Sequence, residues 1–68
     1  MPTMEEQEFK FILKKNGYYK IKTMYSKQGE TKFVWVYKGH AEINDFSKRR
    51  GRIEAGFEDI LRQLDIEP

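Results

Sequence analysis

The chain has 68 residues, a formal net charge of +2 and no cysteine. This length allows a single domain over residues 1–68, near the lower limit at which a hydrophobic core folds unaided, and the lack of cysteine excludes disulfides and thiolate metal sites. Because no apolar run approaches the ~20 residues of a membrane span and the first residues lack the pattern of a secretory signal, we expect a cytoplasmic protein that does not bind membranes.

The first part of the chain predicts two strands joined by a tight turn. Residues 1–7 are polar and acidic, and we expect them to be flexible. Over residues 8–14 apolar side chains recur at every second position, which predicts a strand. Asn16 and Gly17 then form a strong hairpin signal, because both residues tolerate positive φ. Residues 18–25 form the second predicted strand.

The third predicted strand, residues 31–38, is the most distinctive stretch, because every interior residue is β-branched or aromatic. Side chains alternate along a strand, so its rings point to one face and its valines to the other: Phe33, Trp35 and Tyr37 against Val34 and Val36. Neither face is polar, and a chain this short can cover only one of them with its own helices. We therefore expect the uncovered face, or the free edge of this strand, to bind a partner.

After residue 38 the pattern changes towards helix. Residues 40–43 predict either a fourth short strand or an extension of the third past a bulge at Gly39, and the spacing does not decide between them. From Asn44 the apolar period is about 3.6 residues, which predicts a short helix that ends at Gly51. A longer helix is predicted over residues 52–64, where the apolar residues form one continuous stripe.

Together these elements predict an α+β fold. It consists of an antiparallel three-stranded β-meander in residues 8–43, followed in residues 44–66 by a short helix and a longer C-terminal helix packed on one sheet face. Charge is distributed unevenly, with eight lysines and one acid between Lys10 and Lys38 and an excess of acids after Arg52. This asymmetry predicts a basic sheet and an acidic helix, although lysines on strands also commonly protect sheet edges from aggregation.

The sequence predicts no catalytic residue. His40 is the only histidine, its nearest carboxylate in the sequence is Glu42, and there is no thiol for it to activate. A metal site needs three or four converging ligands, and one histidine with scattered acids does not provide them. The glycines do not match the spacing of a phosphate-binding loop. We therefore expect a protein that is not an enzyme and that uses no metal and no cofactor.

One candidate function is the binding of DNA or RNA. Aromatic residues interleave with lysines in the second and third predicted strands, so one sheet face could stack bases on rings and hold phosphates with ammonium groups. A compact basic segment follows near residue 50. The residues that we expect to carry this binding are Lys20, Lys22, Lys32, Trp35, Arg49 and Arg50. In the competing interpretation, about half of the aromatics fill the core of a domain that has few other large apolar residues.

From residue 19 onward the order of features also resembles a known family. The matching pieces are the strand that begins at Tyr19, the turn glycine Gly29, the aromatic strand that ends in Lys38-Gly39, the pair Asp45-Phe46 with Gly51 five residues after the Phe, and a last helix rich in Ile, Leu and acids. These pieces cover most of the chain, with one-residue shifts in each loop. In this order they resemble the small inhibitors of uracil-DNA glycosylase that are encoded by phages of Gram-positive hosts.

The resemblance implies a non-catalytic inhibitor that blocks a host DNA-repair enzyme by mimicking DNA. In that family dimerisation through strand and helix builds an apolar pocket, which holds the leucine that the glycosylase inserts into the DNA minor groove. Carried over to this chain, it implies a homodimer in the host cytosol with partner contacts at Phe46, Asp45, Trp35, Tyr37 and Glu58. Inhibition of uracil-DNA glycosylase is thus the leading hypothesis, and nucleic-acid binding is the alternative.

The chain departs from that family in two respects. It is slightly basic, whereas those inhibitors are acidic and occupy a basic groove. The segment from Ser47 to Arg50 follows Phe46 at the place where the family has an acid and an aromatic. Phe46 could also act only as a hydrophobic staple at the start of the predicted helix. Repulsion from a basic enzyme cleft would slow association unless the acids form the contacting face.

Overall fold

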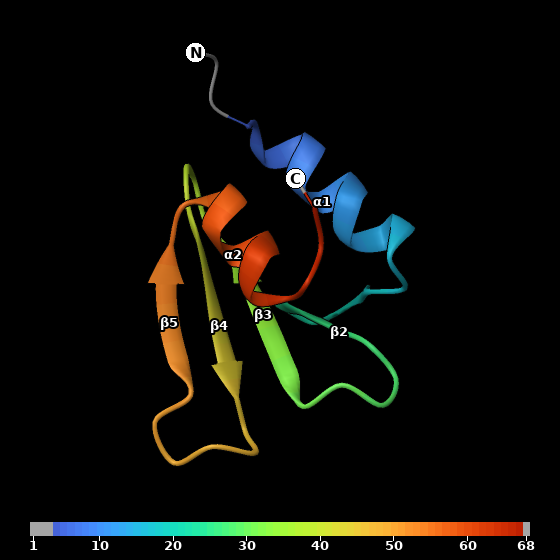
Figure 1. The fold of residues 1–68 in the computed structure, drawn as a ribbon. Helices are drawn as coiled ribbons and strands as arrows, with labels where there is room; N and C mark the ends of the chain where they lie inside the picture. Colours follow the sequence, from blue (N-terminus) through green and yellow to red (C-terminus); the bar gives the residue numbers. More distant parts are fainter. Residues whose placement is uncertain (1–3, 68) are drawn as a thin grey trace.

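The structure, a computed structural model, describes residues 4–67 of the chain. One five-stranded antiparallel sheet, with its strands in sequence order, is preceded and followed by a helix (Figure 1). The elements are α1 (Glu6–Lys15), β1 (Tyr19–Ile21), β2 (Met24–Ser26), β3 (Lys32–Val36), β4 (Ala41–Asp45), β5 (Arg52–Ala55) and α2 (Phe57–Gln63).

The predicted three-stranded meander with a short and a longer C-terminal helix is therefore wrong. The first predicted strand is a helix, the second is a pair of short strands, and the predicted short helix is the end of β4 and a turn. The predicted helix over 52–64 is β5 followed by α2. The division into a sheet up to residue 43 and helices from residue 44 fails for the same reason. Of the predicted flexible lead-in, residues 1–3 lie outside the described residues, and Glu6 and Gln7 belong to α1.

Helix α1 ends where the hairpin turn was predicted. Asn16 is its C-cap, and Gly17 follows in the left-handed region at φ 92°. The Tyr18 N–H donates to the Leu13 carbonyl at 3.0 Å and the Gly17 N–H donates to the Lys14 carbonyl at 3.1 Å, which is the Schellman pattern. Leu13 and Tyr18 are both buried, so the apolar contact that accompanies this motif is also present. The positive φ of Gly17 thus ends a helix here.

The stretch predicted as the second strand folds back on itself. Tyr19 pairs with Ser26 and Ile21 with Met24, so β1 and β2 form a hairpin around a two-residue turn. Lys22 in that turn has φ 56°, a left-handed conformation that is uncommon for a residue with a side chain. Because the chain reverses between them, Tyr19 and Tyr25 lie on opposite faces of the sheet rather than on the same face.

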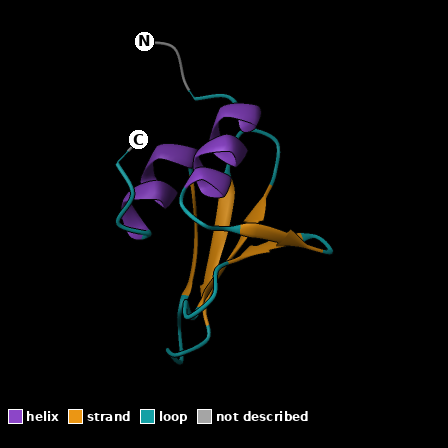
Figure 2. Ribbon diagram, turned by 90° about the vertical axis from the view of Figure 1, so that its right-hand side faces the viewer, coloured by secondary structure: helices purple, strands orange, loops and turns teal. Residues whose placement is uncertain are grey.

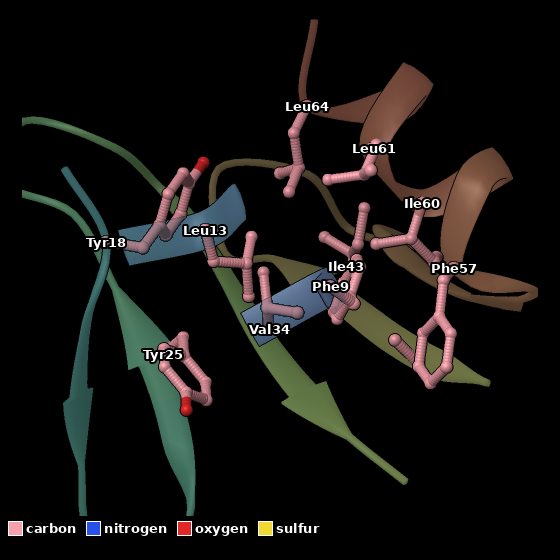
Figure 3. Packing of buried hydrophobic residues seen from close by; sticks show 11 residues of the cluster. Phe9, Leu13, Tyr18, Tyr25, Val34, Ile43, Phe57, Ile60, Leu61 and Leu64 are labelled. Carbon is pink, nitrogen blue, oxygen red and sulfur yellow. The ribbon is translucent and has the colours of Figure 1, made fainter. Parts of the chain in front are cut away.

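Both helices cover the same face of the sheet (Figure 2). The core between the layers contains Phe9 and Leu13 of α1, Ile60 and Leu61 of α2, and Val34 of β3, each 2% exposed or less. The rings of Phe9 and Phe57 stack with centroids 4.7 Å apart and so join the two helices. Figure 3 shows these side chains meeting above the strands. Strand β3 lies in the middle of the sheet, paired on both sides; it falls within the predicted strand of residues 31–38 but is shorter, from Lys32 to Val36.

The link from β4 to β5 depends on a glycine. The Asp45 N–H donates to the Gly51 carbonyl at 2.9 Å and closes this hairpin. A Cβ at Gly51 would lie 2.3 Å from the Asp45 carbonyl oxygen, a distance that only a shift of the backbone could relieve. Gly51 was predicted as a residue that follows a helix, whereas it is required here because two segments of backbone approach closely.

Candidate functional site

The face of the sheet opposite the two helices is here called the open face. Val34 and Ile43 pair across β3 and β4 and point into the core, so the residues on either side of each point the other way. The registers of the remaining strands extend this face across the sheet. The open face consists of Tyr19, Ile21, Met24, Ser26, Phe33, Trp35, Tyr37, Glu42, Asn44, Phe46, Arg52 and Glu54.

An aromatic pair lies at one end of the open face. Phe46 packs edge-on against Phe33, with ring centroids 5.0 Å apart and an interplanar angle of 86°. Its side chain is nevertheless 62% exposed, whereas Phe33 and Trp35 are half-buried. The Phe46 N–H donates to the Thr31 carbonyl at 3.1 Å, which fixes the backbone beneath the ring. The result is an exposed ring held in place at the edge of an apolar surface.

The opposite end of the open face holds a polar network around Glu42. Its carboxylate is only 5% exposed and forms an ion pair with the Arg52 Nε. The Tyr37 hydroxyl lies 3.5 Å from Glu42 Oε1, and the Tyr37 ring stacks on His40 with centroids 5.1 Å apart. Partial burial and the nearby Glu42 carboxylate raise the pKa of Tyr37, and the hydrogen bond to Glu42 raises the pKa of Arg52. The central carboxylate is therefore neutralised by Arg52 rather than presented to solvent.

A basic loop adjoins the aromatic pair. Lys48, Arg49 and Arg50 lie between β4 and β5, separated from Phe46 only by Ser47, and all three are exposed. None of them forms an ion pair with a described residue. Three cationic groups are thus available to a ligand at the same end of the sheet as the exposed ring.

Asp45 holds this loop in place. Its carboxylate accepts hydrogen bonds from the Thr31 hydroxyl at 2.8 Å, the Ser47 hydroxyl at 2.6 Å and the Ser47 N–H at 3.0 Å. These bonds, the Ser47 hydroxyl first, lower the pKa of Asp45 to about 2. The side chain connects the loop before β3 to the loop after β4. It is 6% exposed and lies on the helix side of the sheet.

The residues predicted to bind nucleic acid do not all converge. Trp35 lies on the open face, and Arg49 and Arg50 lie on the adjoining basic loop. Lys22 is in the turn between β1 and β2, away from that loop. Lys20 and Lys32 belong to the helix side of the sheet, opposite Tyr25 and Asp45 in the register. Three lysines and rings on one face were expected, but the strand reversal at Lys22 separates them.

The residues predicted to contact a protein partner also divide into two groups. Phe46, Trp35 and Tyr37 share the open face. Asp45 points to the other side and its carboxylate is engaged within the protein. Glu58 is in the first turn of α2, in the helix layer. These five residues therefore do not form one contact surface on a single protomer.

Phe33 and Arg52 are two of the open-face residues that were not singled out as site residues from the sequence. Phe33 could have been predicted from the sequence, since it lies two residues before Trp35 in the same strand and therefore points to the same face. Arg52 lay within the predicted helix, so its position opposite Asn44 and beside Glu42 depended on recognising β5.

No group of three or more His, Asp or Glu side chains in residues 4–67 is placed to hold a metal ion. Within the same residues, neither helix has the length and apolar composition to cross a membrane. Comparison of the chain with protein-family models, with curated proteins and with solved structures found no match.

Proposed function

We propose that the protein binds single-stranded nucleic acid on the open face. The observation that carries this proposal is the aromatic pair of the exposed Phe46 and the half-buried Phe33 beside the basic loop, on a sheet face that neither α1 nor α2 covers. Stacking of a base on an aromatic side chain is worth about 1–3 kcal/mol and tolerates any base. Cationic side chains next to the rings would hold the phosphates that connect successive bases.

The arrangement favours single strands over a duplex. Bases present their faces to protein rings only when they are unstacked, and a sheet face that carries rings is suited to splayed bases. Phe46, the most exposed ring of the open face, is the first stacking position, and the half-buried Trp35 continues the apolar surface towards the middle of the sheet. Arg49 and Arg50 would contact phosphates, whereas Arg52 is engaged with Glu42.

The test measures the affinity for a short fluorescent oligothymidylate by anisotropy at low salt. Phe46→Ala should weaken binding by ~5- to 100-fold, because one stacking contact is lost. The control is Phe11→Ala, which removes a ring that is 64% exposed on α1, outside the sheet. It should bind as the unmodified chain does. Circular dichroism should show that both variants fold. Absence of binding, or equal weakening by both substitutions, would contradict the proposal.

Inhibition of uracil-DNA glycosylase stays a second prediction, and the exposure of Phe46 favours it as well. The same Phe46→Ala variant tests this prediction, since the resemblance implies that this ring makes the apolar contact with the enzyme. The purified chain at micromolar concentration should inhibit the glycosylase on uracil-containing DNA, and the variant should not. A pull-down with the glycosylase in the absence of DNA distinguishes the two proposals. An inhibitor should bind the enzyme directly, whereas a protein that binds only nucleic acid should not.

A further inference from the structure

The outer edge of β5 is unpaired among the described residues. β5 is the last strand in the sheet order and pairs only with β4 (Figure 1). Arg52, Ile53 and Glu54 are all exposed, and Ile53 is an apolar side chain left 41% exposed on the helix side of the sheet. A free strand edge offers backbone donors and acceptors to another strand.

The hydrogen bonds of the β4–β5 hairpin show which groups face outwards. Asp45 and Gly51 are opposite each other in this register, and the Asp45 N–H donates to the Gly51 carbonyl. Hydrogen-bonded and non-bonded pairs alternate along an antiparallel ladder, so Ile53 and Ala55 also direct their backbone groups towards β4. The backbone groups of Arg52 and Glu54 therefore point away from the sheet, towards a partner strand.

We propose that two copies of the chain pair antiparallel through β5, with Ile53 of each copy opposite Ile53 of the other. In this register the outward backbone groups of Arg52 face those of Glu54 in the second copy. The two-fold axis generates the same pair a second time, with the copies exchanged. Each arginine also faces a glutamate across the strands, and opposite charges at such positions stabilise a pair. The two Ile53 side chains meet at a non-bonded position, where side chains approach most closely, and cover each other.

Charge selects this register among those that the backbone allows. Centring the pair on Arg52 would place two arginines opposite each other, and centring it on Glu54 would place two glutamates opposite each other. Like charges directly opposite are destabilising. Among the residues of β5, only the register centred on Ile53 places unlike charges opposite each other. The partner is thus a second copy of this chain, whose edge is complementary to itself.

The pairing would extend the sheet to ten strands. Residues opposite each other in adjacent strands point to the same side, so the two open faces would lie side by side and the helices of both copies would cover the other face. This inference does not depend on what the open face binds, and it holds or fails separately from the proposed function.

Cross-linking tests the register, since the chain has no cysteine of its own. Thiols introduced by Ile53→Cys should lie opposite each other across the axis, at a separation that a disulfide can span. Those introduced by Glu54→Cys would be offset by two residues along the strands, too far apart for a disulfide, and should cross-link at least about tenfold more slowly under mild oxidation. Equal rates, faster cross-linking of Glu54→Cys, or no cross-linking of either variant would overturn the proposal.

Sedimentation equilibrium tests the pairing without cross-links. The unmodified chain should show a mass that rises from monomer to dimer with concentration. Glu54→Arg places like charges opposite each other and should stay monomeric over the same range. Glu54 also lies 3.6 Å from the His40 Nε2, so Glu54→Gln is the control that removes the carboxylate charge beside His40 without introducing a positive one. It should still dimerise. A monomeric unmodified chain, or dimerisation of Glu54→Arg equal to that of the control, would overturn the proposal.

Discussion

Asp45 and Phe46 are adjacent in the chain, but their side chains lie on opposite faces of the sheet and have different roles. The sequence resemblance treated them as one contact, Asp-Phe, on the premise of a helix. In the structure they stand at the end of a strand, where neighbouring side chains point to opposite faces. Phe46 therefore reaches the open face, and Asp45 stabilises the two loops from the helix side. The role of each residue followed from the type of element, which the pair alone does not specify.

Asp45 should make the stability of the protein depend on pH. Its pKa is about 2 in the folded protein, below the ordinary 3.8, so the unfolded chain takes up its proton first as the pH falls. The stabilisation is therefore complete above about pH 4 and is lost as the pH falls from 4 to 2. Asp45→Asn removes the charge and should lower the midpoint of thermal unfolding by several degrees at pH 7.

The measurement is thermal unfolding of both proteins by circular dichroism between pH 2 and pH 7. The difference between the midpoints should shrink as the pH falls, because protonated aspartic acid loses the charge that the Ser47 and Thr31 donors stabilise. A difference that stays constant over this range would show that the carboxylate charge is not what holds the loops.

Among the elements, β3 was predictable and α1 was not. The β-branched and aromatic residues of 31–38 suit a central strand on both faces. In α1, apolar residues at every second position imitate a strand, because Phe11 lies at a strand-like position but is exposed to solvent. The helical signals were Glu6 and Glu8 in the first turn and Lys14 and Lys15 in the last, which complement the helix dipole.

The end of the chain was misassigned for a different reason. The apolar stripe from Ile53 to Leu64 has helical spacing, yet Ile53 belongs to β5 and only the later residues lie on α2. Gly56, with extended φ and ψ, is the N-cap that separates the two elements. The spacing could not show this break, because the position of Ile53 depends on pairing with Ile43, a contact between distant parts of the chain.

Helix α1 should contribute to stability through one of its faces only. Phe9 is fully buried and stacks on Phe57, so Phe9→Ala should lower the free energy of unfolding by ~3–5 kcal/mol. This loss is a large part of the whole free energy of unfolding of a small domain, so the Phe9→Ala variant should be partly unfolded even without denaturant. Phe11→Ala should change the free energy of unfolding by less than about 0.5 kcal/mol. Urea titration followed by Trp35 fluorescence measures both; equal losses would contradict this packing.

At the scale of the whole molecule, the two helices cover one face and leave the other open. Sequence reasoning predicted this shortage of cover from the rings and valines of one strand, and Val34 is indeed in the core while Tyr37 is 39% exposed. It placed Arg49 and Arg50 beside the sheet, but it grouped Lys20, Lys22 and Lys32 with them, and these lysines lie elsewhere. The position of the basic loop beside Phe46 arises from the β4–β5 hairpin, and the hairpin was not recognised.

Because the basic loop holds only three cationic side chains, nucleic-acid binding under our proposal should depend on salt only modestly. If Lys48, Arg49 and Arg50 together neutralise about three phosphates, the slope of log K against log salt should be about −2 for a single strand. Affinity should then fall by roughly 20-fold between 50 and 200 mM salt. The double substitution Arg49→Ala and Arg50→Ala should reduce the slope to about −0.7.

Phe46→Ala is the matched comparison for this titration, because a stacking contact releases no counterions. It should weaken binding at every salt concentration and leave the slope unchanged. Anisotropy titrations at four salt concentrations separate the two effects in one set of data. A slope that falls equally in both variants would mean that ring and loop do not act as separate parts of the site. A slope near zero in the unmodified chain would show that the basic loop is not part of the binding site.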